Sequence, residues 1–401
     1  MTPEIKQRIE QIRRGEVPER YVKTALGLAP ANWKRYTFGD IYTERKEPGD
    51  ENLPLLMVSI HSGVSDGEVD AAELPKQVKR IEDKSQYKKA VSGDLVFNMM
   101  RAWQGAIGTV RTTGMVSPAY IVAEPNDKAY PLFMDYYSRT PQMINQIDRQ
   151  SYGVTDFRKR LYWDSFAPIS CALPPIEEQQ KIAAILTTQD RVIELKEKCL
   201  AEKQRQKKYL MQQLLTGKKR LPGFNGAWKT DCLGKLFFER KETNCENIEM
   251  LAITGTQGII PRKELDLKDN SSEDKSKYLR VCVGDIGYNT MRMWQGVSAY
   301  SNYEGIVSPA YTILKPSSSI NAKYFAYLFK MSEIVFLFYR FSQGLVDDTR
   351  NLKYENFKKI KVCYPPDIKE QTAIAEVLSA ADREIELLQQ DIEQEKQKKK
   401  A

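Results

Sequence analysis

The chain has 401 residues, of which 41% are hydrophobic, and its 61 Lys and Arg against 53 Asp and Glu give a net charge of +8. At roughly 150 residues per domain the length predicts two or three domains, and the apolar content excludes a wholly disordered chain. The basic balance is compatible with a polyanionic partner such as nucleic acid.

The N-terminal segment (1–32) is charged and lacks the apolar stretch of a signal peptide. No apolar run in the chain approaches the ~20 residues that a membrane span needs, so we expect a cytoplasmic protein. The spacing of Ile5, Ile9 and Ile12 predicts a helix near the start of the segment.

Residues 33–172 have short apolar runs broken by Gly, Pro, Asn and Asp, which predicts a compact α+β domain. The expected strands are residues 53–60, 94–100 and 119–124, and a helix is expected over 131–147.

Residues 173–220 predict one long helix that begins after Pro174-Pro175. Its heptad positions are Leu186, Ile193, Leu200, Lys207 and Leu214. Such a repeat, flanked by charged residues, is typical of a coiled coil. An amphipathic helix packed on its own domain is the alternative.

The remaining 181 residues repeat this plan. FNMMRAWQG (97–105) returns as YNTMRMWQG (288–296), and VSPAY (116–120) returns at 307–311, both 191 residues later. Residues 221–363 therefore predict a linker and a second α+β domain, and 364–401 a second long helix with heptad positions Leu378, Ile385, Ile392 and Lys399. The matched heptads favour the two long helices packing together as an antiparallel coiled coil with pseudo-two-fold symmetry. The second helix lacks a counterpart of 210–217, and we expect the N-terminal segment to supply it, giving a circular arrangement.

Catalytic signatures are missing from the sequence. There is neither a phosphate-binding GxxxxGK[ST] loop nor a dinucleotide-binding GxGxxG, and the six cysteines form no CxxC pair. The single histidine, His61, has Thr256 at its repeat position, so the two halves share no catalytic histidine. We therefore expect binding without catalysis, with no metal and no cofactor on this chain.

The shared Asn-x-Met-Arg-x-Trp-Gln-Gly motif carries side chains that contact bases or phosphates. We expect Trp103, Trp294, Tyr120 and Tyr311 to belong to the domain cores, and the arginines to contact phosphate. Residues that read different bases should differ between the copies, which points to the divergent windows 64–86 and 259–277, with 139–160 as an alternative. The candidate DNA-binding residues are Lys76, Lys79, Arg80, Asn98, Arg101, Gln104, Arg262, Lys263, Lys268, Asn289, Arg292 and Gln295.

The order of these segments, with PPIEEQQKIAAIL (174–186) and PPDIKEQTAIAEVL (365–378) opening the two long helices, resembles the specificity subunit of type I restriction-modification systems. The resemblance covers nearly the whole chain. It implies two target recognition domains, each reading one half of a bipartite, asymmetric DNA site, with the helices setting their separation. It also implies two modification subunits that use S-adenosylmethionine, and motor subunits that use ATP and Mg²⁺ to cleave DNA.

The helices are expected to dock the modification subunits through repeat-matched polar residues, Gln179 with Gln371 and Asp190 with Asp382. Local capping or packing is the alternative role for the two glutamines. Two other functions compete with the specificity subunit: a coiled-coil scaffold with two protein-binding domains, and a self-contained DNA methyltransferase or nuclease. The latter would need a cofactor fold of ~200 residues, for which the chain has no free stretch.

Overall fold

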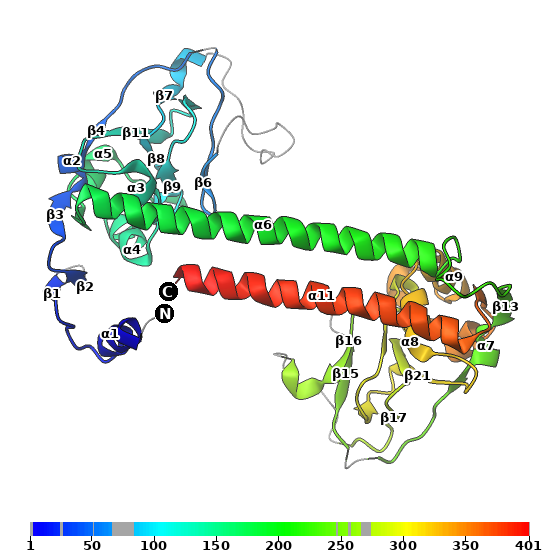
Figure 1. The fold of residues 1–401 in the computed structure, drawn as a ribbon. Coiled ribbons are helices and arrows are strands. Elements are labelled where there is room, and N and C mark those ends of the chain that lie inside the picture. Colours follow the sequence, from blue (N-terminus) through cyan, green and yellow to red (C-terminus); the bar gives the residue numbers. More distant parts are fainter. Residues whose placement is uncertain are drawn as a thin grey trace. The chain divides into compact units, whose positions relative to one another are not determined.

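The computed structural model describes residues 3–24, 27–50, 52–65, 84–245, 248–255, 258–265 and 274–400 (Figure 1). The chain divides into two compact units, residues 1–191 and 192–401. The boundary falls inside the long helix α6 (Ile176–Leu214), so the start of this helix belongs to unit 1 and its end to unit 2.

The N-terminal segment of unit 1 is only partly helical. Helix α1 (Pro3–Arg13) is followed by an antiparallel hairpin of β1 (Tyr21–Thr24) and β2 (Gly27–Pro30). Its expected role in completing the coiled coil remains a prediction.

A four-stranded antiparallel sheet forms the centre of the first domain, in the order β4 (Tyr42–Glu44), β11 (Tyr120–Pro125), β8 (Leu95–Asn98) and β9 (Ile107–Thr109). Three two-stranded ladders accompany it: β3 (Lys34–Thr37) with β12 (Ser170–Leu173), β5 (Val58–Ser59) with β6 (Gly63–Val64), and β7 (Lys88–Ala90) with β10 (Gly114–Val116). The helices are α2 (Phe38–Ile41), α3 (Pro131–Tyr137), α4 (Pro141–Arg149) and α5 (Trp163–Phe166).

The helix expected over 131–147 is two helices, α3 and α4. Pro141 lacks the amide hydrogen that a continuous helix would need there, and the hydroxyl of Thr140 accepts a hydrogen bond from the amide of Met143 (3.4 Å). The Thr-Pro pair therefore ends one helix and caps the next.

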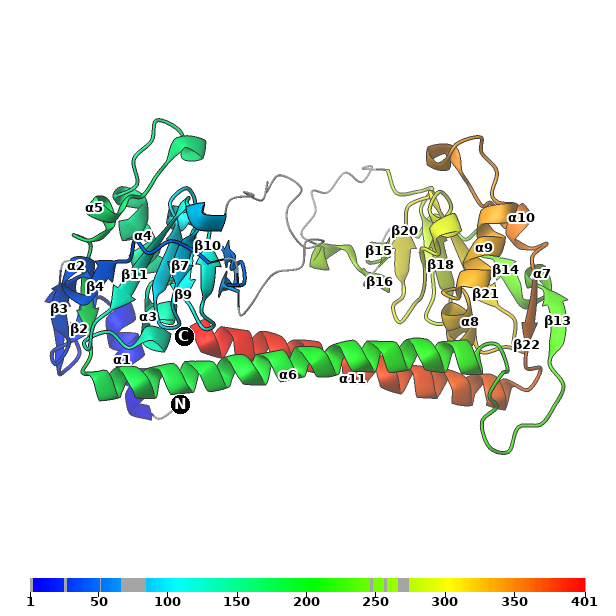
Figure 2. The same ribbon diagram turned by 90° about the horizontal axis from the view of Figure 1, so that it is seen from above.

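Both faces of the sheet are buried, because the side chains of its central strands are apolar on both faces. Leu95 and Phe97 belong to one core cluster, shared with α3 and α4, whereas Val96 and Val122 belong to another, shared with β5, β6 and β10. The helices thus cover one face of the sheet, and the short ladders cover the other (Figure 2).

Unit 2 repeats this architecture. Its sheet has the order β14 (Phe237–Glu239), β21 (Tyr311–Pro316), β18 (Ile286–Asn289) and β19 (Ser298–Tyr300). Its ladders are β13 (Lys229–Cys232) with β22 (Lys361–Tyr364), β15 (Leu251–Thr254) with β16 (Gly258–Pro261), and β17 (Leu279–Val281) with β20 (Gly305–Val307). Its helices are α7 (Leu233–Leu236), α8 (Ala322–Leu328), α9 (Ser332–Phe341), α10 (Tyr354–Phe357) and α11 (Ile368–Lys400). The predicted duplication of an α+β domain is confirmed.

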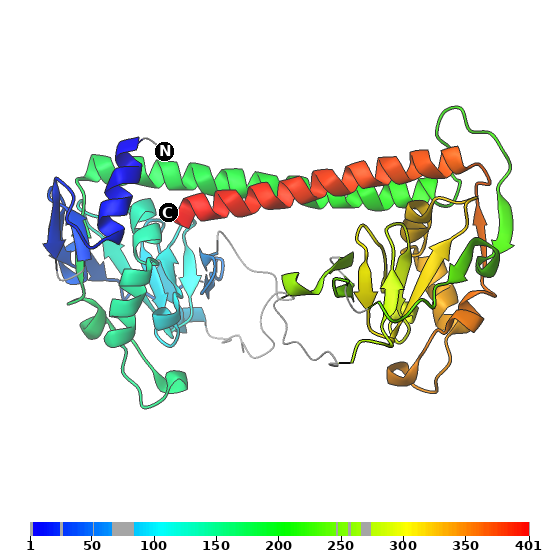
Figure 3. The same ribbon diagram turned by 90° about the horizontal axis from the view of Figure 1, so that it is seen from below.

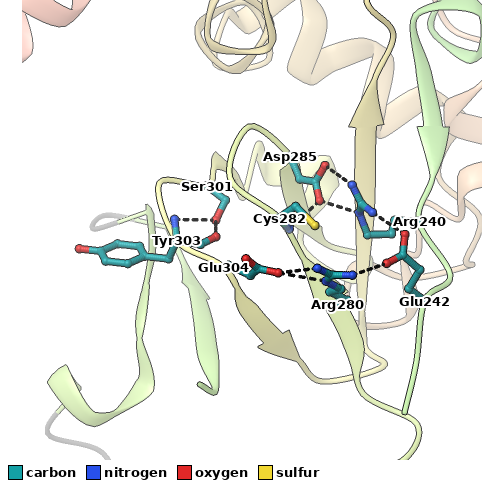
Figure 4. A network of polar contacts seen from close by, with 8 residues as sticks. All are labelled: Arg240, Glu242, Arg280, Cys282, Asp285, Ser301, Tyr303 and Glu304. Carbon is teal, nitrogen blue, oxygen red and sulfur yellow. Dashed lines mark hydrogen bonds and ion pairs between the residues drawn. The ribbon is translucent and has the colours of Figure 1, made fainter. Parts of the chain in front are cut away.

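A buried ion pair occurs at the same place in both domains. The guanidinium of Arg240 donates to both carboxylate oxygens of Asp285, at 2.8 and 3.1 Å, and the side chain of Asp285 is 2% exposed (Figure 4). Asp285 also accepts from the amide of Cys282 at 2.8 Å. Arg45 and Asp94 form the matching pair in the first domain at 2.8 and 3.2 Å. Both residues belong to motifs that occur twice, Glu-Arg-Lys (44–46 and 239–241) and Gly-Asp (93–94 and 284–285), and this contact explains why their Arg and Asp recur.

Within unit 2, the end of α6 packs antiparallel against α11. Along the two helices, Lys196 pairs with Asp391 (2.8 Å), Lys203 with Glu384 (2.6 Å), and Lys207 with Asp382. Ile193, Leu378 and Ile392 of the predicted heptad rows are buried at 9%, 0% and 6% exposure. The predicted pairing of the long helices is therefore confirmed. Across the described ranges, no helix combines the length and apolar character that crossing a membrane requires.

Candidate nucleic-acid interface

The shared motif forms the same tight turn after the central strand of each sheet. The side-chain oxygen of Asn98, the last residue of β8, accepts from the amide of Met100 at 2.9 Å. Asn289 at the end of β18 does the same with the amide of Met291 at 3.0 Å. Both asparagines therefore shape the turn with their carbonyl oxygens, a role that sequence reasoning did not assign to them.

The tryptophans close this turn from inside. The indole of Trp103 donates to the carbonyl of Met100 at 3.0 Å, and Trp294 to that of Met291 at 2.9 Å. Trp103 is half-buried against the first core, and Trp294 meets Tyr339 edge to face, with ring centroids 6.3 Å apart. A short 3-10 turn follows in each copy, η2 (Ala102–Gln104) and η5 (Met293–Gln295).

The glycine that ends the motif in both copies has a conformational reason. Gly105 has φ +102° and Gly296 has φ +79°, the left-handed region that other residues rarely adopt. Asn, Trp and Gly thus shape the turn, whereas among the described residues the side chains of the motif's Arg and Gln form no hydrogen bond or ion pair that holds it.

Those two residues are exposed in both domains: Arg101 and Gln104 in the first, Arg292 and Gln295 in the second. No carboxylate in the described part of the chain forms an ion pair with either arginine. An exposed guanidinium on a rigid turn is suited to bind a phosphate. The structure therefore keeps both arginines available for the contact that the sequence predicted.

The second shared segment lies beside this turn. Tyr120 pairs with Asn98 across β11 and β8, and Tyr311 pairs with Asn289 across β21 and β18. Both tyrosines are half-buried against the clusters on the ladder side of the sheet, so they line the core without being fully enclosed.

A third matched element includes the end of segment 139–160, the alternative base-reading segment of the sequence prediction. Residues 152–160 form a hairpin, closed by backbone hydrogen bonds between Tyr152 and Arg160 at 2.9 and 2.7 Å. Residues 343–351 form its counterpart, closed between Gln343 and Asn351 at 2.9 and 2.8 Å. We call these hairpin 1 and hairpin 2; each stands out from its domain (Figure 3). The signal was present in the sequence, because the Ser, Gly, Asp and Leu of SYGVTDFRKRL (151–161) recur 191 residues later in SQGLVDDTRNL (342–352).

Each hairpin is joined to the shared turn of its own domain. The amide of Leu161 donates to the carbonyl of Met99, and that of Leu352 to the carbonyl of Thr290, both at 2.8 Å. In the first domain the ammonium group of Lys159 also lies 4.6 Å from the centre of the Trp103 ring. Turn and hairpin therefore form one continuous structure in each domain.

The divergent windows are only partly visible. Lys76, Lys79, Arg80 and Lys268 lie outside the described residues. Arg262 and Lys263 begin the 3-10 turn η4 (Arg262–Glu264), which directly follows β16. Lys263 is exposed and forms an ion pair with Glu249 at 2.6 Å.

Gln179 and Gln371, which the sequence placed on an exposed docking face of the helices, are buried instead: their exposed fractions are 1% and 0%. The amide of Gln179 bridges three backbone groups, accepting from the amide of Tyr130 and donating to the carbonyls of Lys128 and Pro174, each at 2.9 Å. Gln371 accepts from the amide of Asn321 at 2.8 Å and donates to the carbonyl of Pro365 at 2.9 Å. The glutamines hold each long helix to its own domain, which is the local capping role weighed above.

The aspartates of the same helices are also engaged locally. Asp190 accepts from the hydroxyl of Tyr136 at 2.8 Å, and Asp382 from that of Tyr327 at 2.6 Å. Burial raises the pKa of Tyr136 to about 12, so this hydroxyl keeps its proton at neutral pH. Asp382 is also paired with Lys207. Both carboxylates already serve the joint between helix and domain.

Comparison with known proteins identifies the family of this chain and finds solved structures with a similar fold. The family model described as the type I restriction modification DNA specificity domain matches residues 72–205 and again 234–396. The chain is similar to the S subunit of the type I restriction-modification system from M. genitalium at 12% identity and a TM-score of 0.57, covering 92% of this chain and 94% of that one.

Two further solved structures resemble it. One comes from work on complex assembly and conformational transition of the type I R-M system (16% identity, TM-score 0.51, covering 92% of this chain and 96% of that one). The other is the HsdS subunit from Thermoanaerobacter tengcongensis (18% identity, TM-score 0.49, covering 92% and 94%).

Proposed function

Because this chain belongs to the family of type I restriction-modification DNA specificity proteins, we propose that its two domains each read one half of a bipartite, asymmetric DNA target. The observation that carries this proposal is the pair of identical turns, with Arg101 and Arg292 exposed on two otherwise divergent domains. Arginines shared by both domains are suited to contact phosphates, because the DNA backbone is the same in every sequence. The segments that differ between the domains are suited to read the bases of two different half-sites.

We expect the arginines to contribute affinity without sequence preference. Replacing Arg101 and Arg292 by Ala should reduce the magnitude of the slope of log affinity against log salt by about 1 per arginine, since each phosphate contact that forms releases about one counterion. The measurement is a titration of labelled duplex DNA at several salt concentrations, with and without modification subunits.

Lys235, which is not among the candidate DNA-binding residues, is the control: it is exposed and already forms an ion pair with Asp231 at 3.1 Å, so Lys235→Ala should leave the slope nearly unchanged. An unchanged slope in both arginine variants would show that the shared turns do not touch the DNA backbone.

For the long helices we propose two roles, setting the separation of the half-sites and docking two modification subunits. Of the polar residues first expected to dock them, the two glutamines are buried and the two aspartates accept hydrogen bonds from tyrosines, so we look to more exposed positions on the same helices. Leu195 on α6 and Leu387 on α11 are matched by the repeat and are 49% and 65% exposed. Two equivalent exposed leucines on paired helices suit two copies of one partner.

The docking proposal predicts that Leu195→Asp together with Leu387→Asp weakens assembly with the modification subunits at least tenfold, because each change puts a charge into an apolar contact. Analytical ultracentrifugation of the mixed subunits measures the loss. Glu194→Gln with Glu386→Gln, at the neighbouring matched positions, is the control and should assemble normally. Full assembly by the aspartate variant would place docking elsewhere.

The cofactors belong to the partners in this proposal. S-adenosylmethionine would bind the modification subunits, and ATP with Mg²⁺ the motor subunits that cleave DNA, with the whole complex acting in the cytoplasm. The chain itself would supply recognition and geometry.

A further inference from the structure

The tips of the two hairpins carry apolar side chains in open solvent. Val154 in hairpin 1 is 93% exposed and Leu345 in hairpin 2 is 99% exposed. These residues occupy the same position, since they are 191 residues apart in the repeat. A single exposed apolar residue is ordinary, but here the same position is apolar and almost fully exposed in two hairpins that share few other residues.

The hairpins are built to hold a fixed shape. A side chain at Gly153 would come within 2.5 Å of the backbone of Arg158, and one at Gly344, where φ is +136°, within 2.6 Å of the carbonyl of Thr349. Close backbone packing across the loop therefore requires glycine in both copies.

A matched ion pair braces each loop: Lys159 with Asp156 at 3.2 Å, and Arg350 with Asp347 at 2.8 Å. The guanidinium of Arg350 also lies 4.0 Å from the centre of the Tyr339 ring, and Tyr339 in turn contacts Trp294 of the shared turn. Because these contacts restrain the loop before binding, ordering its tip on binding should cost little conformational entropy.

The position of the hairpins favours DNA as the occupant. Each is hydrogen-bonded to the turn that carries an exposed arginine, so a domain that meets phosphate through Arg101 or Arg292 brings its hairpin to the same duplex. The apolar group that a duplex offers in its major groove is the C5-methyl of thymine.

We propose that Val154 and Leu345 are specificity-determining residues that contact a thymine methyl group in the first and second half-site, respectively. This inference rests on the proposed function and adds to it an apolar contact by which each domain recognises a base. The shared arginines then position each domain, and the tips distinguish thymine from cytosine or from a base without the methyl group.

The test uses the complete chain assembled with its modification subunits and duplexes that carry its methylation target. Each thymine is replaced in turn by deoxyuridine, which removes only the methyl group, and affinities are measured by fluorescence anisotropy. For the unaltered chain, one replacement in each half-site should weaken binding roughly fourfold, the value of one buried methyl group.

Leu345→Ser should weaken binding to the target roughly tenfold and abolish sensitivity to deoxyuridine in the second half-site only, and Val154→Ser should do the same for the first. Leu345→Met, which keeps an apolar tip, should retain sensitivity. Val283→Ser, at a valine of domain 2 that is 63% exposed outside the hairpin, should behave like the unaltered chain.

Three results would overturn the inference. Serine variants that bind the target with full affinity and full deoxyuridine sensitivity would remove the tips from base readout, while leaving the proposed function intact. Loss of assembly with the modification subunits in the serine variants would make the tips a protein contact. An unaltered chain that binds target and scrambled duplex equally would defeat the proposed function and this inference together.

Discussion

Replacing Asp285 by Ala should destabilise the second domain by about 3 kcal/mol, because it removes the buried partner of the Arg240 guanidinium and leaves only the half-exposed Glu242 to pair with it. The carboxylate is 2% exposed and accepts two hydrogen bonds from Arg240 and one from the amide of Cys282. Arg240→Ala should cost a similar amount. The double variant should cost less than the sum, because the remaining charge is then also removed.

Urea denaturation of the complete chain measures this loss, and hydrogen exchange locates it in β17 and β18. The control is Glu249→Ala, which removes the partner of an exposed lysine and should cost ~1 kcal/mol or less. Equal stabilities for Asp285→Ala and Glu249→Ala would contradict a structural role for the buried pair.

Leu378→Ala should cost about 2–5 kcal/mol, because this side chain of α11 is fully enclosed in the core shared with the end of α6. Leu387, nine residues later on the same helix, provides a matched control: it is 65% exposed, so Leu387→Ala should leave stability nearly unchanged. Thermal unfolding of the two variants separates the buried row from the proposed docking face. Similar melting temperatures would show that α11 is only a linker.

The duplication was predictable from the sequence because each domain keeps the residues that its backbone requires. The Asn, Trp and Gly of the shared turn and the Asp of the buried pair recur after 191 residues, and the Arg of that pair recurs after 195. Each has a defined contact or backbone conformation in the structure. The pairing of the long helices was also predictable, because buried positions recur every seven residues where one helix packs along another.

Burial of single polar residues was not predictable. Gln179 has charged and polar neighbours in the sequence, and only the fold brings the backbone of residues 128–130 against it. The break between α3 and α4 was visible as Thr-Pro but was outweighed by the apolar periodicity on both sides of it. Segment 139–160 was considered for base reading, but its hairpin and the matching hairpin at 343–351 were not predicted. Short exposed loops bury little, so only a few scattered residues are shared between the two copies.

The central claim is that two similar but non-identical domains read two different half-sites. Sequencing the methylated bases in a host that expresses this chain with its modification subunits tests it most directly. The account predicts a motif of two short, different sequences separated by a gap of fixed length and unspecified bases. A single continuous palindromic motif would contradict it.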